Sequence, residues 1–162
     1  MPNWVNNTLI IKGHARTVGK VETLLKNGEQ ALVLNNLLPC PEGLLNDDWQ
    51  TNQEIHDANV AKYGVGGWYD WRVKYWGTKW DVADASFAKS KGEISYGFDT
   101  AWSPPCEWVA ALSKRFPSLT ITLEYHEEAD LYPSAICTYE DGRQSNYKVI
   151  PNINLEEDED ED

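Results

Sequence analysis

The chain has 162 residues, of which 41% are hydrophobic and 25% charged, a composition typical of one soluble globular domain. No apolar run approaches the roughly 20 residues that span a bilayer, and the first residues lack the pattern of a secretory signal, so we expect a cytoplasmic protein without membrane contact. The formal net charge of −12 repels phosphate and argues against a nonspecific nucleic-acid binder.

The N-terminal part of the chain predicts one strand and one helix. Residues 4–12 alternate between apolar and polar side chains, which indicates a first strand. A helix is expected over 18–26, with Thr17 as its N-cap and Asn27-Gly28 as its stop. Residues 32–38 form a short apolar run that predicts either a strand or a buried loop.

The middle of the chain predicts two helices. The first covers about 52–63, and the second covers 68–76, where Gly77 is placed to act as its C-cap. Four of the eight tryptophans fall within 68–81, and helical spacing in this block would give one aromatic face. We interpret this block as an internal brace in which three tryptophans are buried: Trp71, Trp76 and Trp80.

The second half predicts two strands, a helix and three further strands. Ser103 followed by two prolines is typical of a helix start, and Asp141-Gly142 is typical of a tight hairpin turn. The strands are expected over 80–87, 93–100, 119–126, 134–139 and 143–150, and the helix over 103–116.

This order of elements predicts an α+β fold. With 93–100 as the second main strand, the order is strand, helix, strand, helix, strand, strand, which is the ferredoxin-like split βαβ arrangement. We expect a mainly antiparallel sheet with helices on one face, in a single domain over 1–150. A large insertion over about 29–90 would follow the first helix. Residues 151–162 are expected to form a disordered acidic tail, because the last seven residues are all acidic.

Several motifs carry a resemblance to a known family: Pro2-Asn3-Trp4, Leu38-Pro39-Cys40-Pro41, the WGTKWD stretch at 76–81 and the FDTAWSPP stretch at 98–105. They resemble the YubB ferredoxin-like domain family, which is found on bacteriophages and conjugative plasmids. The resemblance covers nearly all of residues 2–150. It implies a ferredoxin-like fold and an origin on a mobile element, and it implies no catalytic residues.

Residue types that serve catalysis or metal binding are present but scattered. The sequence has no P-loop, HExxH or nucleophile-elbow motif. The three cysteines lack the spacing of metal ligands and are expected to be buried free thiols. Carboxylates near the aromatic block are expected to cap turns, form ion pairs or face water: Asp70, Asp81, Asp84 and Asp99. We therefore expect no enzyme activity, no metal and no cofactor.

The aromatic and basic block at 68–81 leaves one alternative open. Ferredoxin-like sheets in RNA-recognition modules stack bases on aromatic side chains, so this block could serve a single-stranded nucleic-acid or RNA-binding module. The net charge and the expected burial of its tryptophans oppose direct nucleic-acid binding. Trp68 and Tyr69 are the aromatic residues in this block that we still expect to contact a ligand.

Clustered acidic residues predict a different function. Acidic side chains steer association with basic proteins and can imitate a phosphate array, although surface acids also simply keep proteins soluble. Combined with the mobile-element resemblance, they favour a non-enzymatic accessory protein. It would bind and inhibit a host defence protein with a basic nucleic-acid groove, such as a CRISPR effector or a restriction-type nuclease, in the host bacterial cytoplasm. The predicted partner-binding residues are Glu42, Asp47, Asp48, Glu54, Asp57, Trp68, Tyr69, Glu127, Glu128 and Asp130.

Overall fold

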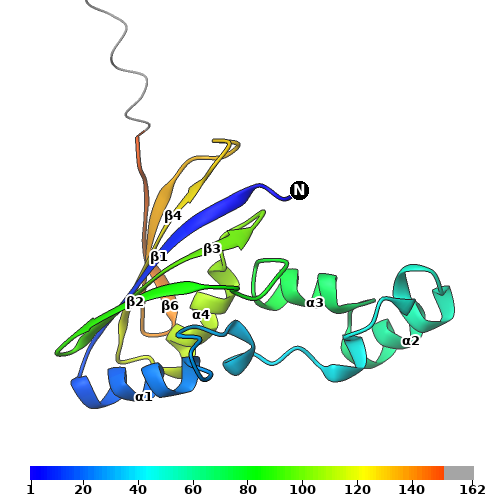
Figure 1. The fold of residues 1–162 in the computed structure, drawn as a ribbon, viewed down its shortest axis with the longest axis horizontal. Coiled ribbons are helices and arrows are strands. Elements are labelled where there is room, and N and C mark those ends of the chain that lie inside the picture. The colour runs from blue at the N-terminus through cyan, green and yellow to red at the C-terminus, as the bar shows by residue number, and fades with distance from the viewer. Residues whose placement is uncertain (152–162) are drawn as a thin grey trace, which may run out of the picture.

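A six-stranded antiparallel sheet forms the centre of the computed structural model, which describes residues 1–151 (Figure 1). The strand order across the sheet is β2-β3-β1-β4-β5-β6. The strands are β1 (Trp4–Lys12), β2 (Ala85–Ser90), β3 (Glu93–Ala101), β4 (Thr120–Glu127), β5 (Ala135–Glu140) and β6 (Arg143–Val149). The helices are α1 (Ala15–Leu25), α2 (Gln53–Tyr63), α3 (Trp68–Tyr75) and α4 (Cys106–Arg115), with 3₁₀ turns η1 (Leu34–Asn36), η2 (Glu42–Leu44) and η3 (Asp48–Gln50).

One face of the sheet carries the hydrophobic core. Alternate residues of β1 point to this face, where Val5, Leu9 and Ile11 are completely buried. The helices α1 and α4 cover the same face (Figure 1), and their apolar stripes complete the core. The opposite face is open and carries mostly small or polar side chains, such as Asn6 and Thr8. Within residues 1–151, no helix is both long enough and apolar enough to cross a membrane.

The connectivity confirms the predicted ferredoxin-like fold class. The elements β1, α1, β2, β3, α4 and β4, with strand order β2-β3-β1-β4, form the split βαβ core. The hairpin of β5 and β6 extends this sheet beyond β4. The strand assignment needs one correction, because β2 rather than residues 93–100 is the second main strand. Residues 85–90 therefore belong to the sheet, although we expected them within the insertion.

Two helix starts also differ from the prediction. The helix α1 begins three residues early, since the His14 side chain rather than Thr17 accepts the backbone N–H of Arg16. At α4, Ser103 is not the N-cap. Its hydroxyl donates instead to the carbonyl of Gly77, and the helix begins at Cys106.

Of the two alternatives predicted for residues 32–38, the structure has the buried loop, which surrounds η1. The strand predicted over 80–87 begins only at Ala85, because the Asp81 side chain accepts the backbone N–H of Val82 and turns the chain there. The predicted hairpin turn is confirmed, with both Asp141 and Gly142 at positive φ.

The segment between α1 and β2 projects from the sheet. Figure 1 shows α3 beside α4 and α2 farther out, and we call residues 46–67 the α2 arm. Asn52 caps the start of α2 and Gly64 ends it at φ 79°, so the helix lies close to the predicted range of 52–63. Trp76 fixes α3 to the body of the domain, because it is fully buried and its indole N–H donates to the carbonyl of Leu38 at 2.9 Å.

Candidate binding site at an exposed tryptophan pair

Two tryptophans from distant parts of the chain meet at one end of β1. Trp4 lies opposite Ala101 in the sheet, and the loop that carries Trp80 is anchored to the same residue by the Thr78 hydroxyl, which donates to the Ala101 carbonyl at 2.9 Å. The indole rings of Trp4 and Trp80 lie 6.2 Å apart at an angle of 43°. Trp80 is 37% exposed and Trp4 39% exposed. The prediction that Trp80 is buried is therefore wrong.

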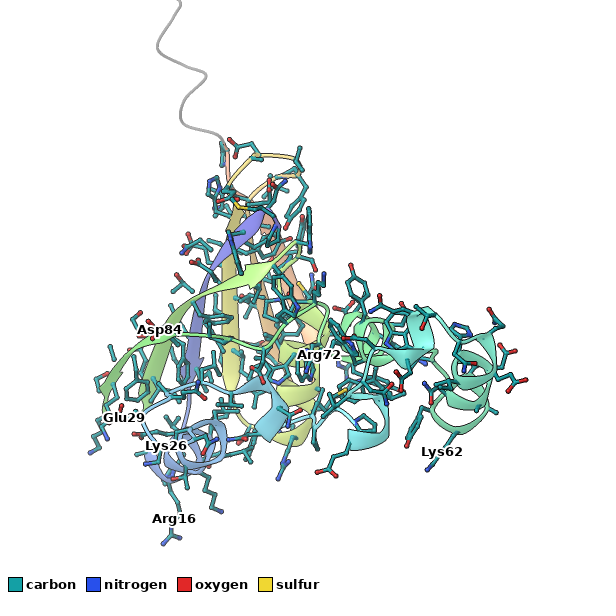
Figure 2. The ribbon with its side chains drawn as sticks, turned by 45° about the vertical axis from the view of Figure 1, so that its right-hand side comes forward. Arg16, Lys26, Glu29, Lys62, Arg72 and Asp84 are labelled. Atoms are coloured by element: carbon teal, nitrogen blue, oxygen red, sulfur yellow. The ribbon has the colours of Figure 1, made fainter. Side chains whose placement is uncertain are left out.

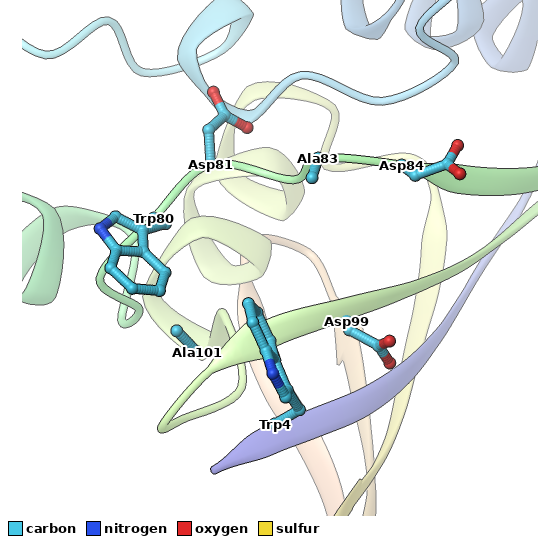
Figure 3. Close-up of a pocket in the computed structure, with 7 residues that line it drawn as sticks. All are labelled: Trp4, Trp80, Asp81, Ala83, Asp84, Asp99 and Ala101. Atoms are coloured by element: carbon cyan, nitrogen blue, oxygen red, sulfur yellow. The ribbon is translucent and has the colours of Figure 1, made fainter. Parts of the chain in front are cut away.

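A cavity of about 420 Å³ lies beside this tryptophan pair. Figure 3 shows the two indole rings at one end of the cavity and two carboxyl groups at the other. The lining residues are Trp4, Trp80, Asp81, Ala83, Asp84, Asp99 and Ala101. We call this cavity the Trp4–Trp80 pocket. A neighbouring hollow shares two of its acidic residues, Asp84 and Asp99.

The three carboxylates that line the pocket have different roles. Asp81 is structural, because its oxygens accept the backbone N–H groups of Leu34 at 2.8 Å and Asn35 at 3.0 Å. Asp99 uses one oxygen, Oδ1, to accept the side-chain N–H of Asn6 at 3.2 Å. Within residues 1–151, no basic side chain lies within ion-pair distance of Asp84 or Asp99. Their negative charge is therefore available to a ligand.

One of the two pocket tryptophans, Trp80, already has a cation over its ring, although this cation does not line the pocket. The ammonium group of Lys79 lies 4.7 Å from the ring centre of Trp80 and 4.9 Å from that of Tyr69. Such distances are typical of cation–π contacts, in which the negative face of the ring attracts the charge.

A third exposed tryptophan follows directly after β3. Trp102 is 46% exposed and has φ 71°, in the left-handed region. Its backbone N–H donates to the carbonyl of Asn3 at 2.8 Å, and its carbonyl accepts the hydroxyl of Tyr132 at 3.2 Å. Exposed tryptophans are common at the centres of protein interfaces, so this end of the sheet has the composition of a contact surface.

The predicted acidic residues lie in two separate places. The first group is exposed on or next to the α2 arm: Glu42, Asp47, Asp48, Glu54 and Asp57. The second group, Glu127, Glu128 and Asp130, lies at the end of β4, well away from α2 in Figure 1. Figure 2 shows Lys62, at the end of α2, far from Asp84, which lines the pocket, so the arm and the pocket lie apart. The ten predicted residues therefore form no single surface.

Glu127 requires a correction, because it is only 1% exposed. Its Oε2 atom accepts the backbone N–H groups of Ala129 and Leu131, which organises the turn after β4. It therefore cannot meet a partner. Glu128 is exposed, and its carboxylate accepts the backbone N–H of Trp4 at 2.9 Å, so the second acidic group adjoins the tryptophan pair.

Trp68 and Tyr69 are half-buried and already have internal partners. The indole N–H of Trp68 donates to Asp47 at 2.9 Å. The guanidinium of Arg72 lies 5.0 Å from the Trp68 ring and 4.9 Å from the Trp76 ring. The Trp68–Asp47 bond links the α2 arm to α3, and together these contacts leave less aromatic surface for a ligand.

His126 and the three cysteines lie in surroundings that do not suit catalysis. His126 contacts both Ser134 and Asp130 through the same Nδ1 atom, whereas a catalytic triad uses the two ring nitrogens for different partners. Burial raises the pKa of the Cys106 thiol to about 12 and also raises the pKa of Cys40 and Cys137, which suppresses the reactive thiolate. Among residues 1–151, no three His, Cys, Asp or Glu side chains group as a metal site.

The tryptophan pair was not predicted as a site, although a signal was present. Trp4 and Trp80 both fall within motifs that carry the family resemblance. Nothing in the local sequence brings them together, because their contact depends on how β1 pairs with β3.

Comparisons with known proteins agree with the fold. The family model for the ferredoxin-like domain in Api92-like protein matches residues 75–162. The crystal structure of a protein Api92 from Yersinia pseudotuberculosis superimposes with a TM-score of 0.63 and 12% sequence identity, over 94% of this chain and 99% of that one. At this identity the likeness shows the fold alone. No curated protein matches the sequence.

Proposed function

The chain belongs to the family of the ferredoxin-like domain in Api92-like protein, and we propose that it is a non-enzymatic accessory protein that binds and inhibits a host nucleic-acid-handling defence protein. The partner would be a CRISPR effector or a restriction-type nuclease with a basic nucleic-acid groove. The motifs shared with the YubB family support an origin on a phage or plasmid, and the proposed place of action is the host cytoplasm.

The observation that carries this proposal is that the two carboxylates beside the exposed tryptophans form no ion pair within residues 1–151. Asp84 and Asp99 lack basic partners within residues 1–151, and they adjoin Trp4 and Trp80. Tryptophan is enriched among the residues that dominate binding energy. A carboxylate beside it favours a basic partner and repels phosphate. This end of the sheet is therefore better suited to bind the basic groove of a nucleic-acid-binding protein than to bind a nucleic acid.

The exposed acids of the α2 arm support the same proposal in a different way. They lie away from the Trp4–Trp80 pocket and add to a formal net charge of −12. Charges of this kind accelerate association with a basic partner over distances of about 10 Å at ordinary salt concentrations. We assign them to steering and the pocket to contact.

The alternative, a single-stranded nucleic-acid binder that uses residues 68–81, has only part of the predicted aromatic surface, because Tyr75 and Trp80 are exposed but Trp68 and Tyr69 are half-buried. Trp71 and Trp76 are buried, and Arg72 is stacked between Trp68 and Trp76. A gel-shift assay at low salt tests it directly with single-stranded DNA and RNA. A shift at micromolar protein that Tyr69→Ala abolishes would favour this alternative.

A plating assay tests the proposed function in cells. A panel of host strains, each with one CRISPR or restriction system, expresses the chain and is challenged with a phage that the system blocks. We expect restored plating in at least one strain. The double variant Asp84→Asn/Asp99→Asn should reduce the restoration roughly tenfold or more, the effect of about 1.4 kcal/mol of binding energy.

The control variant Glu124→Gln/Glu140→Gln makes the same change in charge at exposed positions of β4 and β5 and should plate like the wild type. Absence of restored plating in every strain would overturn the proposed function. Equal losses in the two double variants would remove the pocket from it.

A further inference from the structure

We infer that the Trp4–Trp80 pocket receives the guanidinium group of an arginine side chain on the partner protein. This inference rests on the proposed function, since it names the chemical group that the proposed contact surface recognises. Its elements are two indole rings, two unpaired carboxylates and a cavity of about 420 Å³.

The indole rings provide the first half of the recognition. Because the rings of Trp4 and Trp80 are tilted by 43°, they form an open wedge rather than a closed stack. Lys79 lies over the Trp80 ring at 4.7 Å. The Trp4 ring has no such internal cation among residues 1–151. A planar, weakly hydrated guanidinium stacks on an exposed indole face more readily than a compact ammonium does.

The carboxylates provide the second half. Asn6 engages only Oδ1 of Asp99, which leaves Oδ2 without a hydrogen bond from residues 1–151. Asp84 is exposed and accepts no hydrogen bond there either. Figure 3 shows both groups at the end of the pocket opposite Trp80. An arginine that stacks on Trp4 would extend its forked N–H groups toward these oxygens, and such charge-assisted bonds are about twice as strong as neutral ones.

Other ligand classes fit the pocket less well. A phosphate would be repelled by both carboxylates, and an apolar side chain would remove their water without replacing their hydrogen bonds. A lysine would satisfy the charge but would present no flat group to the indole. Arginine combines a flat group with a charge that it keeps at neutral pH, whereas histidine is mostly neutral there.

A peptide titration followed by NMR tests the inference on the full chain. The indole N–H signals of Trp4 and Trp80 are identified with single Trp→Phe variants. Capped Gly-Arg-Gly is then compared with capped peptides that carry lysine or the neutral isostere citrulline, and with spermidine and an oligo-dT strand. The arginine peptide should shift the Trp4 and Trp80 signals at millimolar concentrations. Lysine and spermidine should shift them at several-fold higher concentrations, and citrulline and oligo-dT should leave them unchanged.

Variants give the inference a matched control. Asp84→Asn/Asp99→Asn should weaken the binding of the arginine peptide roughly tenfold or more. Asn at position 99 keeps an acceptor for Asn6. Glu124→Gln/Glu140→Gln should bind like the wild type. Equal shifts with arginine, lysine and citrulline would overturn the inference. Shifts with oligo-dT, or no shift with any peptide, would also overturn it. Shifts that depend on protein concentration without any peptide would overturn it too, because they would indicate that a second copy of the chain occupies the pocket.

The two experiments separate the two proposals. If the arginine peptide binds as expected but no strain regains plating, the arginine pocket stands and the defence-inhibitor function falls. If plating depends on Asp84 and Asp99 but the peptides show no preference for arginine, the function stands and the arginine inference falls.

Discussion

The carboxylate of Asp81 accepts the backbone N–H of Leu34 at 2.8 Å, and this bond joins the first part of the segment between α1 and β2 to its last part. The same side chain also binds the N–H groups of Asn35 and Val82. A single residue therefore closes the long connection, in which α2 and α3 lie, and sets the start of β2.

This relationship predicts different stability effects for two nearby aspartates. Asp81→Asn should lower the free energy of unfolding by about 1–3 kcal/mol, since an amide cannot replace a carboxylate that accepts several backbone N–H groups. Asp84→Asn should change it by less than about 0.5 kcal/mol. Urea unfolding followed by tryptophan fluorescence measures both. Equal effects would show that Asp81 does not hold the segment closed.

Two tryptophans of the 68–81 block should also respond differently. Trp76→Ala removes a fully buried side chain and its hydrogen bond to Leu38, and should lower the free energy of unfolding by about 3–5 kcal/mol. Trp80→Ala should cost about 1 kcal/mol, because Trp80 is partly exposed, yet it should abolish the indole response to the arginine peptide. Unfolding curves and peptide titrations of the two variants check this. A strongly destabilised Trp80 variant would contradict the assignment of Trp80 to binding.

Two glycines should respond to alanine with opposite signs. Gly77 has φ 81°, a backbone conformation that L side chains rarely adopt, so Gly77→Ala should destabilise the fold by about 1–3 kcal/mol, whereas the exposed Glu107 carboxylate near the new Cβ can move away. Gly19 lies within α1 with open space around the position of a Cβ. Gly19→Ala should stabilise the fold by about 0.5–1 kcal/mol. Thermal unfolding of both variants measures the contrast, and a stabilised Gly77→Ala protein would contradict a left-handed backbone at position 77.

Alkaline pH should destabilise the protein. Burial raises the pKa of Cys106 from 9.0 to about 12 and that of Tyr132 from 10.0 to about 12. Between pH 9 and 12 the unfolded chain therefore releases protons that the folded chain retains, and stability falls as pH rises. Cys106 contributes at most about 1.4 kcal/mol per pH unit, and the half-buried Tyr132 contributes less because solvent screens it. Urea unfolding at pH 8 and pH 10 measures the loss. Cys106→Ala should flatten this slope, and an unchanged slope would contradict the role of this thiol.

Neutralising the α2 arm should slow association with the partner without unfolding the chain. The variant Asp47→Asn/Asp48→Asn/Glu54→Gln/Asp57→Asn keeps an acceptor at position 47 for the Trp68 indole. The association rate should fall several-fold at low salt, and the difference should vanish at high salt because ions screen exposed charges. Stopped-flow kinetics with a partner found in the plating assay measures this rate. A rate unaffected at any salt concentration would leave these acids with no part in steering.

Local patterns made much of the fold predictable. Alternation in β1 and β4 placed these strands correctly, and the helix predicted over about 52–63 corresponds to α2. The role of β2 was missed because this edge strand is exposed along most of its length and shows no alternation of burial. The tryptophan pair was missed for a different reason, since sheet register and the Thr78 anchor bring its members together. The predicted tail beyond Pro151 lies outside the described residues.

The conformation of Trp102 has a practical consequence for protein engineering. A residue other than glycine at φ 71° costs about 1–2 kcal/mol, and a side chain that is 46% exposed regains little of this through burial. Glycine would relieve the backbone at this position. If variants were selected for thermal stability alone, Trp102→Gly would be favoured. The selected proteins would then be more stable but would lack an exposed tryptophan of the contact surface.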